Sequence, residues 1–225
     1  MKICIIGDGL TSLSLAKNLI NKKINVHMYQ KKIFNNIPSS RTIGISNNNL
    51  NFFKKEIDDL PKKSSWEIKK IEIFSEMLKN NKLLKFENDK STLFHMVKNE
   101  TLYKSLNKKL SKSKFFIKKI IKQKNFYDKL LKKNNYDLII NCDENNYISK
   151  KYFIKKLHIN YKNIAYTTIL DHESIKNNSA IQVFTDFGPI AFLPISNMKT
   201  SVVCSFDTQN KSYNDDEIID EDTDQ

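Results

Sequence analysis

The chain has 225 residues, of which 40% are hydrophobic, so it can bury the core of one large domain or of one and a half. Its mean hydropathy of −0.52, without an apolar run as long as a membrane span, favours a globular over a membrane-spanning protein. The formal charge of +13 suits nucleic acid or an anionic membrane surface. However, Lys, Asn and Ile are all enriched together, which is more typical of the codon bias of an AT-rich genome. Proteins that read bases usually use arginine, and this chain has only one, so no nucleic-acid partner is expected.

Glycine marks the first unit of the fold. The chain has four glycines, where about sixteen are usual for this length, and Gly7 and Gly9 directly follow the apolar run at 2–6. That run predicts a buried parallel strand. The broad apolar face of 10–22 predicts a helix, and 24–29 predicts a second strand. This β-turn-α-β succession is the opening unit of a dinucleotide-binding fold.

The middle of the chain mixes strands and helices. A polar loop at 31–40 leads to an extended piece at 41–46 and a helix near 47–56. The helix predicted at 99–111 is amphipathic, with leucines every four residues at Leu102, Leu106 and Leu110. Further strands are predicted at 66–74 (with Ile68, Ile71 and Ile73 inward), at 83–86 as its pairing partner, at 115–121, and at 136–142 as a third buried strand of the parallel sheet.

From residue 164 the pattern becomes rich in strands. Four β-prone segments separated by turn residues predict an antiparallel sheet over 164–206. The stretch 207–225 is sharply acidic and is predicted to be disordered. We therefore divide the chain into a Rossmann-like part at 1–63 and 99–158, a β-rich part at 64–98 and 159–206, and the acidic tail.

The loop Gly7-Asp8-Gly9-Leu10-Thr11-Ser12 has the spacing of a phosphate-binding turn. Gly7 permits the tight turn, Gly9 lets the backbone approach a pyrophosphate at the positive end of the next helix, and Ser12 is small enough for the third glycine position. The alternative is a glycine turn that binds nothing. The acidic residue that usually holds the adenosine ribose is replaced by Gln30, which can still hydrogen-bond a hydroxyl but without a charge.

Cysteine and histidine carry no recognisable site. The three cysteines, Cys4, Cys142 and Cys204, have no metal-ligand or disulfide spacing. Cys4 and Cys142 are expected to be buried, inert thiols in a reducing cytoplasm. The four histidines form no constellation, so we expect no metal, and the catalytic residues are unknown.

Several blocks, in order, carry a resemblance to a known family. They are IIGDGLTSLSLAKNL, SSRTIGISNNNLNFF, HMVKNETLYKSLNKKL, YDLIINCDENNYISKKYF and YKNIAYTTILDHESIKNNSAIQVFTDFGPIAFLPI, which together span residue 1 to about 206. The chain resembles the FAD-dependent hydroxylases of ubiquinone biosynthesis, within the class-A flavoprotein monooxygenases. The resemblance implies a Rossmann-like FAD-binding domain with an inserted antiparallel β-sheet substrate domain, incomplete at the C-terminus.

The resemblance also implies roles for individual residues. Gly7, Gly9, Leu10, Thr11 and Ser12 would hold the FAD diphosphate, and Gln30 would face the ribose. Arg41 would lie along the diphosphate or ribityl chain, unless it is a solvated loop cation. Asp143 matches an Asp-Gly block, although Glu144 replaces the glycine. A substrate pocket would draw on Phe187, Pro189, Phe192 and Pro194, although proline also marks strand edges and phenylalanine also fills cores.

The implied activity is hydroxylation of a polyprenylated phenol or quinol ring, with FAD as cofactor and NAD(P)H as co-substrate. Implied partners are a prenylated aromatic molecule, the inner membrane face as a peripheral surface for a cytoplasmic protein, and a ubiquinone-biosynthesis complex. The family's second flavin motif, a Gly-Asp pair, is missing, so a fragment, a frameshifted product or a degenerate paralogue is expected. The alternatives are a non-catalytic or accessory relative, and another NAD(P)-binding oxidoreductase, which the β-rich block disfavours.

Overall fold

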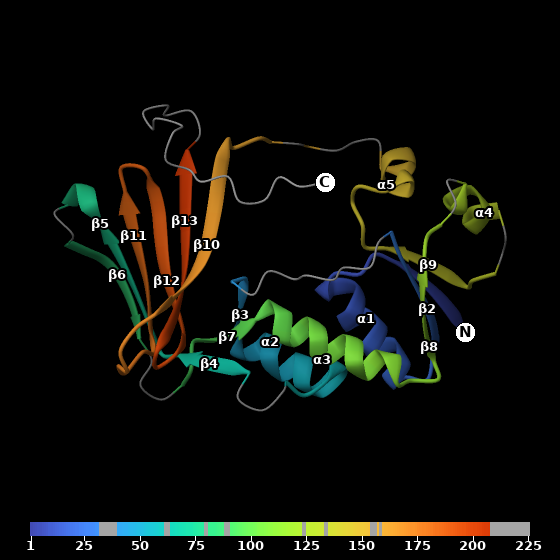
Figure 1. Ribbon diagram of the computed structural model, residues 1–225, viewed down its shortest axis with the longest axis horizontal. Coiled ribbons are helices and arrows are strands. Elements are labelled where there is room, and N and C mark those ends of the chain that lie inside the picture. The colour runs from blue at the N-terminus through green and yellow to red at the C-terminus, as the bar shows by residue number, and fades with distance from the viewer. Residues whose placement is uncertain are drawn as a thin grey trace.

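The computed structural model describes residues 1–31, 40–60, 64–78, 81–87, 91–122, 125–132, 135–153, 157 and 159–207. Its strands form three sheets, with four, three and six strands. Figure 1 shows the four-stranded sheet and its helices at one end, the six-stranded sheet at the other, and the three-stranded sheet between them. Of the tail predicted at 207–225, only Asp207 is among the described residues, as the last residue of a strand.

Four parallel strands form the sheet that the first thirty residues begin. The order is β8-β2-β1-β9, and every neighbouring pair is parallel. The strands are β1 Lys2–Ile6, β2 Asn25–Gln30, β8 Phe116–Ile120 and β9 Leu138–Asn141. The prediction that 136–142 joins this sheet is confirmed. The expectation of a buried strand there was wrong, because β9 lies at an edge, where Leu138 is exposed.

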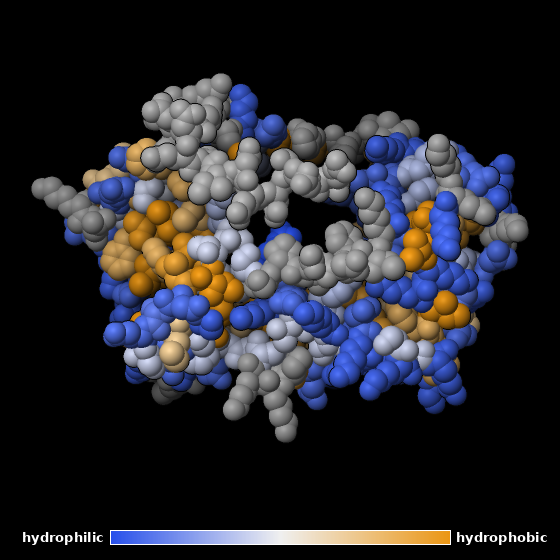
Figure 2. All heavy atoms as spheres, in the orientation of Figure 1, coloured by the Kyte–Doolittle hydropathy of each residue, from blue (hydrophilic) through white to orange (hydrophobic). Residues whose placement is uncertain are grey.

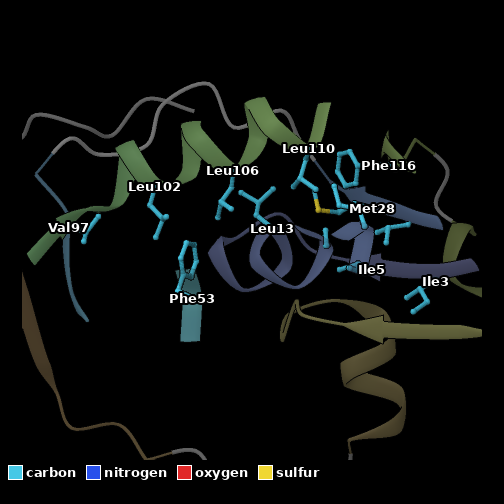
Figure 3. Packing of buried hydrophobic residues seen from close by; sticks show 13 residues of the cluster. Ile3, Ile5, Leu13, Met28, Phe53, Val97, Leu102, Leu106, Leu110 and Phe116 are labelled. Carbon is cyan, nitrogen blue, oxygen red and sulfur yellow. The ribbon is translucent and has the colours of Figure 1, made fainter. Parts of the chain in front are cut away.

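Two helices, α1 Leu10–Asn21 and α3 Asn99–Ser111, cover one face of this sheet. Ile5, Met28 and Leu13 meet there in a continuous core, and Figure 3 shows the row of α3 leucines pointing into it. Leu102, Leu106 and Leu110 are almost fully buried, as predicted. Each buried leucine contributes about 1.5–3 kcal/mol relative to exposure. This packing fixes the start of α1 beside the end of β1.

Two short helices, α4 Phe126–Lys132 and α5 Tyr147–Tyr152, contribute to the core on the opposite face. There Cys4 and Ile6 pack against Tyr127 and Leu130 of α4 and Ile148 of α5. Neither helix was predicted, because segments of six or seven residues carry too little periodicity to be distinguished from loops. The parallel sheet and these four helices therefore form a three-layered α/β/α unit.

The three-stranded sheet has the antiparallel order β3-β7-β4. Its strands are β3 Thr42–Ser46, β4 Ser65–Ile68 and β7 Phe94–Lys98. Strand β7 was not predicted. The helix predicted near 47–56 is present as α2 Asn47–Phe52 followed by the π-helical turn η1 Phe53–Ile57. Since β3 pairs with β7, hydrogen bonding crosses from the segment 1–63 to the segment 64–98.

The six-stranded sheet has the order β10-β13-β12-β11-β5-β6. Its strands are β5 Lys70–Ser75, β6 Asn81–Glu87, β10 Asn163–Asp171, β11 Ser179–Thr185, β12 Gly188–Ser196 and β13 Lys199–Asp207. A short 3-10 turn, η2 Glu76–Leu78, follows β5. The predicted pairing of 83–86 with the preceding strand is confirmed by the β5–β6 ladder.

The antiparallel arrangement predicted over 164–206 is confirmed, because β10, β13, β12 and β11 pair antiparallel in that order. The whole six-stranded sheet is mixed, since β5 adds to it in parallel with β11. One expectation for this sheet was wrong. The single strand predicted at 66–74 is two strands in two different sheets, divided at Lys69, whose amide donates to the Asn178 carbonyl at 3.0 Å. Ile68 is buried as predicted, while Ile71 and Ile73 are half-buried. Across the described segments, no helix has both the length and the apolar character needed to cross a bilayer.

Candidate functional site

The turn between β1 and α1 has two glycines with different roles. Gly7 has a φ of +119°, and an added Cβ there would lie 3.0 Å from the Ser12 hydroxyl and 3.3 Å from the Cys142 carbonyl carbon. Its amide donates to the Tyr29 carbonyl at 2.9 Å. Gly9 is exposed, and a Cβ there would meet nothing within 4 Å. Gly7 therefore has a structural role, while Gly9 leaves an open cradle at the protein surface.

The first turn of α1 opens onto this cradle. Gly9 caps the helix in an extended conformation, no side chain caps it, and the first turn has no acidic residue. The first helical hydrogen bond is donated by Leu13 to the Gly9 carbonyl, at 3.0 Å. The amides of Leu10, Thr11 and Ser12 thus remain for an anion, and the helix dipole favours one there. Ser12 is 1% exposed, and its hydroxyl has no hydrogen-bond partner within the described residues.

Gln30 lies at the carboxyl end of β2, beside the same loop. Its side chain is 4% exposed, and its Oε1 atom has no partner in the described part of the chain. Its backbone carbonyl accepts from the Ile121 amide at 2.8 Å. A buried amide oxygen without a donor costs free energy, and a ribose hydroxyl would supply the donor. The position predicted for the ribose contact therefore has an unmet acceptor.

Asp143 follows β9, so it too lies at the carboxyl ends of the parallel strands. Its Oδ2 forms an ion pair with the Lys31 ammonium at 3.2 Å, and its Oδ1 accepts from the Asn145 amide at 3.0 Å. Asn146 caps α5 by accepting from the Ser149 amide, and Ser149 donates to the Asp143 carbonyl at 2.9 Å. These bonds hold Asp143 beside the turn, while Glu144 is exposed.

Arg41 is exposed and directly precedes β3, in the region between the parallel sheet and the six-stranded sheet. Its carbonyl accepts from the Asn99 amide at the start of α3. The flanking residues contact the six-stranded sheet: the Ser40 hydroxyl lies 3.2 Å from that of Thr167, and Thr42 donates to the Ser201 hydroxyl at 3.2 Å. Arg41 thus lies between the parallel unit and the six-stranded sheet, and it forms no ion pair within the described residues.

The residues predicted for a substrate pocket spread along one hairpin. Phe187 is half-exposed in the β11–β12 turn, and Pro194 is fully buried at the far end of β12. Strand alternation puts Pro189 on one face and Phe192 and Pro194 on the other. These four residues are not brought together. Figure 2 nonetheless shows hydrophobic atoms gathered over β11 and β12, which gives this sheet an apolar surface.

Asp8 was not predicted as a functional residue, yet it lies inside the glycine turn. Its Oδ2 atom is buried without a partner among the described groups. Burial raises the pKa of this carboxyl, Lys118 lowers it, and Asp143 raises it. An acidic residue is unexpected in a turn that is predicted to bind a negatively charged phosphate, and the sequence alone shows it. This unexpected charge could have identified Asp8 as a functional candidate from the sequence.

Cysteine and histidine occupy structural positions. Burial raises the pKa of the Cys4 thiol to about 12, so the prediction of an inert thiol holds there, while Cys142 is half-buried. The described residues contain no cluster of three or more His, Cys, Asp or Glu that could hold a metal ion. His158 lies outside the described residues. The three described histidines, His27, His95 and His172, lie outside the glycine turn at 7–12.

The residues present fit a dinucleotide. Three features lie together at the carboxyl ends of the parallel strands: the open cradle at Gly9, the uncapped amides of α1, and the Gln30 oxygen that has no partner among the described residues. Together they match a diphosphate followed by a ribose. FAD contains this group. The departures from the usual pattern are Gln30 in place of an acidic residue and Glu144 in place of a glycine.

No protein-family model matches the sequence, and a search of curated proteins finds no similar one. Solved structures are similar in fold. PqsL of Pseudomonas aeruginosa, described as a probable FAD-dependent monooxygenase, has a TM-score of 0.68 at 11% identity, over 93% of this chain and 61% of PqsL. HpxO of Klebsiella pneumoniae, a single-residue variant complexed with FAD, has a TM-score of 0.65 at 12% identity, over 91% and 57%. A geranylgeranyl bacteriochlorophyll reductase-like protein of Thermoplasma acidophilum has a TM-score of 0.62 at 13% identity, over 92% and 57%.

These similarities show the fold. The chain spans about three fifths of the length of these proteins, and over that span its mixed α/β architecture, with a parallel and a mixed sheet, is the fold of FAD-dependent monooxygenases.

Proposed function

We propose that this chain binds FAD and carries the cofactor and substrate halves of a flavin-dependent aromatic monooxygenase. The observation that carries the proposal is that the open glycine cradle and a buried Gln30 oxygen, unpartnered among the described residues, lie at the carboxyl ends of two neighbouring strands. A diphosphate on the amides of Leu10 to Ser12 and a ribose on Gln30 would satisfy both. The fold shared with PqsL and HpxO supports FAD as the dinucleotide.

When bound, FAD supplies the redox chemistry by which reduced flavin activates O₂ and oxygenates an electron-rich ring. The chain's own residues would bind and orient. The first turn of α1 would fix the diphosphate, and Arg41 would add a planar cation at the border between the parallel unit and the six-stranded sheet. The apolar surface over β11 and β12 would exclude water from the ring. None of these roles requires a proton-transfer residue.

For the substrate we propose a polyprenylated phenol or quinol, with NAD(P)H as the reductant of the flavin. The support is the resemblance of the block 161–195 to ubiquinone-biosynthesis hydroxylases and the exposed apolar atoms of the six-stranded sheet. Association with other enzymes of ubiquinone biosynthesis is part of the same proposal. The competing function is a non-catalytic or accessory relative, which Gln30 and Glu144 favour because both depart from the flavoprotein pattern.

The test begins with the absorbance spectrum of the purified protein. We expect the bands of oxidised flavin, and release of FAD on denaturation. Gly9→Val should abolish these bands, whereas Ser111→Val, which adds the same side chain at an exposed helix end, should leave them unchanged. A folded wild-type protein that is colourless and fails to take up added FAD would refute the proposal. Flavin without NAD(P)H-dependent oxygenation of a prenylated phenol would favour the non-catalytic relative.

We also propose peripheral association with an anionic membrane surface on the cytoplasmic side. The stretch from residue 147 to 170 contains five lysines and no acidic residue. Its described aromatic side chains are strongly exposed, 66% for Phe153 and 77% for Tyr161. Aromatic rings beside lysines are the composition of protein surfaces that lie in the lipid headgroup region. Such a surface would bring a prenylated substrate to the chain.

A further inference from the structure

Asp8 is an acidic residue in the middle of the proposed phosphate-binding turn. The residue is half-buried, and its Oδ2 atom has no exposed surface and no hydrogen-bond partner within the described residues. It lies between Gly7, whose left-handed φ fixes the turn, and Gly9, which leaves the cradle open. The carboxyl is thus held next to the amides that would bind a diphosphate.

The charged and titratable groups around Asp8 come from three other elements. Lys118 of β8 is the nearby cation, and its ammonium donates to the Asn107 side chain of α3 at 3.3 Å. Tyr103 of α3 contributes a phenol, and Asp143 beyond β9 contributes a second negative charge. Burial raises the pKa of Asp8, the charge of Lys118 and a hydrogen bond from the backbone of Asp8 itself oppose that rise, and the charge of Asp143 adds to it.

The same environment acts on the neighbours. Burial lowers the pKa of Lys118, and the charge of Asp8 offsets part of that effect. Burial raises the pKa of Tyr103, and the charge of Asp8 raises it further. Lys118 is thus the cation that acts on Asp8, whereas Asp143 has Lys31 as its own partner. A diphosphate in the cradle would bring further negative charge next to this carboxylate, whose Oδ2 atom is buried without a partner among the described residues.

We propose that Asp8 takes up a proton when the diphosphate of FAD occupies the glycine turn, so that FAD binding strengthens as the pH falls. The inference rests on the proposed function, because it needs FAD in this turn. The neutral carboxyl removes a like charge next to the phosphates, and its hydroxyl becomes a donor in place of an unpartnered acceptor. Asp8 is therefore a positioning residue that couples cofactor affinity to pH.

Linkage fixes the sign of the effect. The phosphate charge raises the pKa of Asp8 above its value in the free protein, so the complex holds more protons than the separated partners. Between these two pKa values, the dissociation constant of FAD rises by up to about tenfold for each unit of pH increase. Below the lower value Asp8 is protonated in both states, and the affinity becomes independent of pH.

The experiment is titration calorimetry of the FAD-free full chain with FAD, from about pH 5 to pH 8, in two buffers whose ionisation enthalpies differ at each pH. The buffer difference counts the protons taken up. Asp8→Asn keeps the shape of the side chain and removes its titration. Asp59→Asn makes the same change at an exposed position outside the site and is the matched control. Thermal unfolding of each FAD-free protein checks that it is folded.

We expect proton uptake and weaker binding at higher pH for the wild type and for Asp59→Asn. Asp8→Asn should bind FAD about tenfold or more tightly than the wild type at pH 8, without proton uptake. FAD binding whose pH profile and proton count are the same in Asp8→Asn would overturn the inference and leave FAD binding intact. A folded wild type that does not bind FAD at any pH would overturn the proposed function and the inference together.

Discussion

A Cβ atom added at Gly188 would lie 2.0 Å from the carbonyl oxygen of Ser205. Gly188 begins β12 with a φ of +136°, so an L side chain is disfavoured there by conformation as well as by space. We predict that Gly188→Ala lowers the free energy of unfolding by about 3 kcal/mol or more, because strain and overlap add. Chemical denaturation measures it. A loss below about 1 kcal/mol would contradict the hairpin geometry.

Substitutions of the two glycines of the turn should affect different properties, the stability of the fold at Gly7 and the affinity for FAD at Gly9. We predict that Gly7→Ala lowers the free energy of unfolding by about 1–3 kcal/mol, because of its left-handed φ and the contacts with Ser12 and Cys142. Gly9→Ala should cost less than about 1 kcal/mol, since its Cβ meets open space and only a helix cap changes. Its FAD affinity should nevertheless fall at least tenfold. Equal affinities for wild type and Gly9→Ala would mean that the cradle is not the diphosphate site.

Three of the glycines have a physical reason in the structure, and the sequence pointed to two of them, Gly7 and Gly9, because they directly follow the first strand. Gly7 and Gly188 have left-handed backbones, and Gly9 leaves open space. The helix at 99–111 was predictable for a comparable reason: leucines at fixed spacing must share one face, and that face needs a core. In that helix the sequence pattern and the observed burial agree, so the sequence alone was sufficient to predict both the helix and its buried face.

Other features depend on contacts between distant segments. The parallel pairing of β5 with β11 joins residues more than a hundred positions apart, and no local pattern encodes it. The break at Lys69 was invisible because β-prone residues continue across it into a second sheet. At the site, the turn and Gln30 were predicted from position in the motif. The burial of Gln30 and the meeting of Asp8 with Lys118 require the assembled sheet.

Two histidines should make the fold less stable in mild acid. Burial lowers the pKa of His95 and of His27, with nearby lysines adding to the effect on His27. Each group binds protons more readily when unfolded, so its contribution is present above about pH 6.5 and is lost as the pH falls below that value. For His95 the structure shows why: Nδ1 is buried without a partner among the described residues, so a proton added there would have no acceptor, while Nε2 lies 2.9 Å from the Asn47 Oδ1 in either state.

The measurement is urea denaturation between about pH 7.5 and pH 5 for the wild type and for His27→Gln/His95→Gln. We expect the free energy of unfolding to fall more steeply in the wild type. The comparison cancels the titration of all other groups, such as Asp8, whose raised pKa acts in the opposite direction. Parallel pH profiles for the two proteins would show that neither histidine resists protonation.

Membrane association should depend on the exposed aromatic residues between the end of α5 and the start of β10. We predict that the protein co-sediments with vesicles containing anionic lipid more than with neutral ones, and that added salt weakens this binding. Tyr152→Ser/Phe153→Ser/Tyr161→Ser should reduce binding severalfold. Leu84→Ser/Phe86→Ser, which removes similarly exposed apolar groups from β6, should not. Equal effects of the two variants would indicate non-specific adhesion.

Gln30 should determine how tightly the ribose is held. Its Oε1 is buried without a partner among the described residues, so a hydroxyl donor is expected to gain a hydrogen bond there at no cost in stability. We predict that Gln30→Leu weakens FAD binding about fivefold to tenfold, the value of one neutral hydrogen bond, while raising the stability of the FAD-free protein by removing an unpaired polar group. Gln30→Glu should bind FAD more tightly than the wild type, because a carboxylate accepts the hydroxyl in a charge-assisted bond. Fluorescence titration with FAD and thermal unfolding separate the two effects. If Gln30→Leu lost stability and affinity together, the amide would be part of the core, and the ribose contact would have to be sought elsewhere along the edge of the parallel sheet.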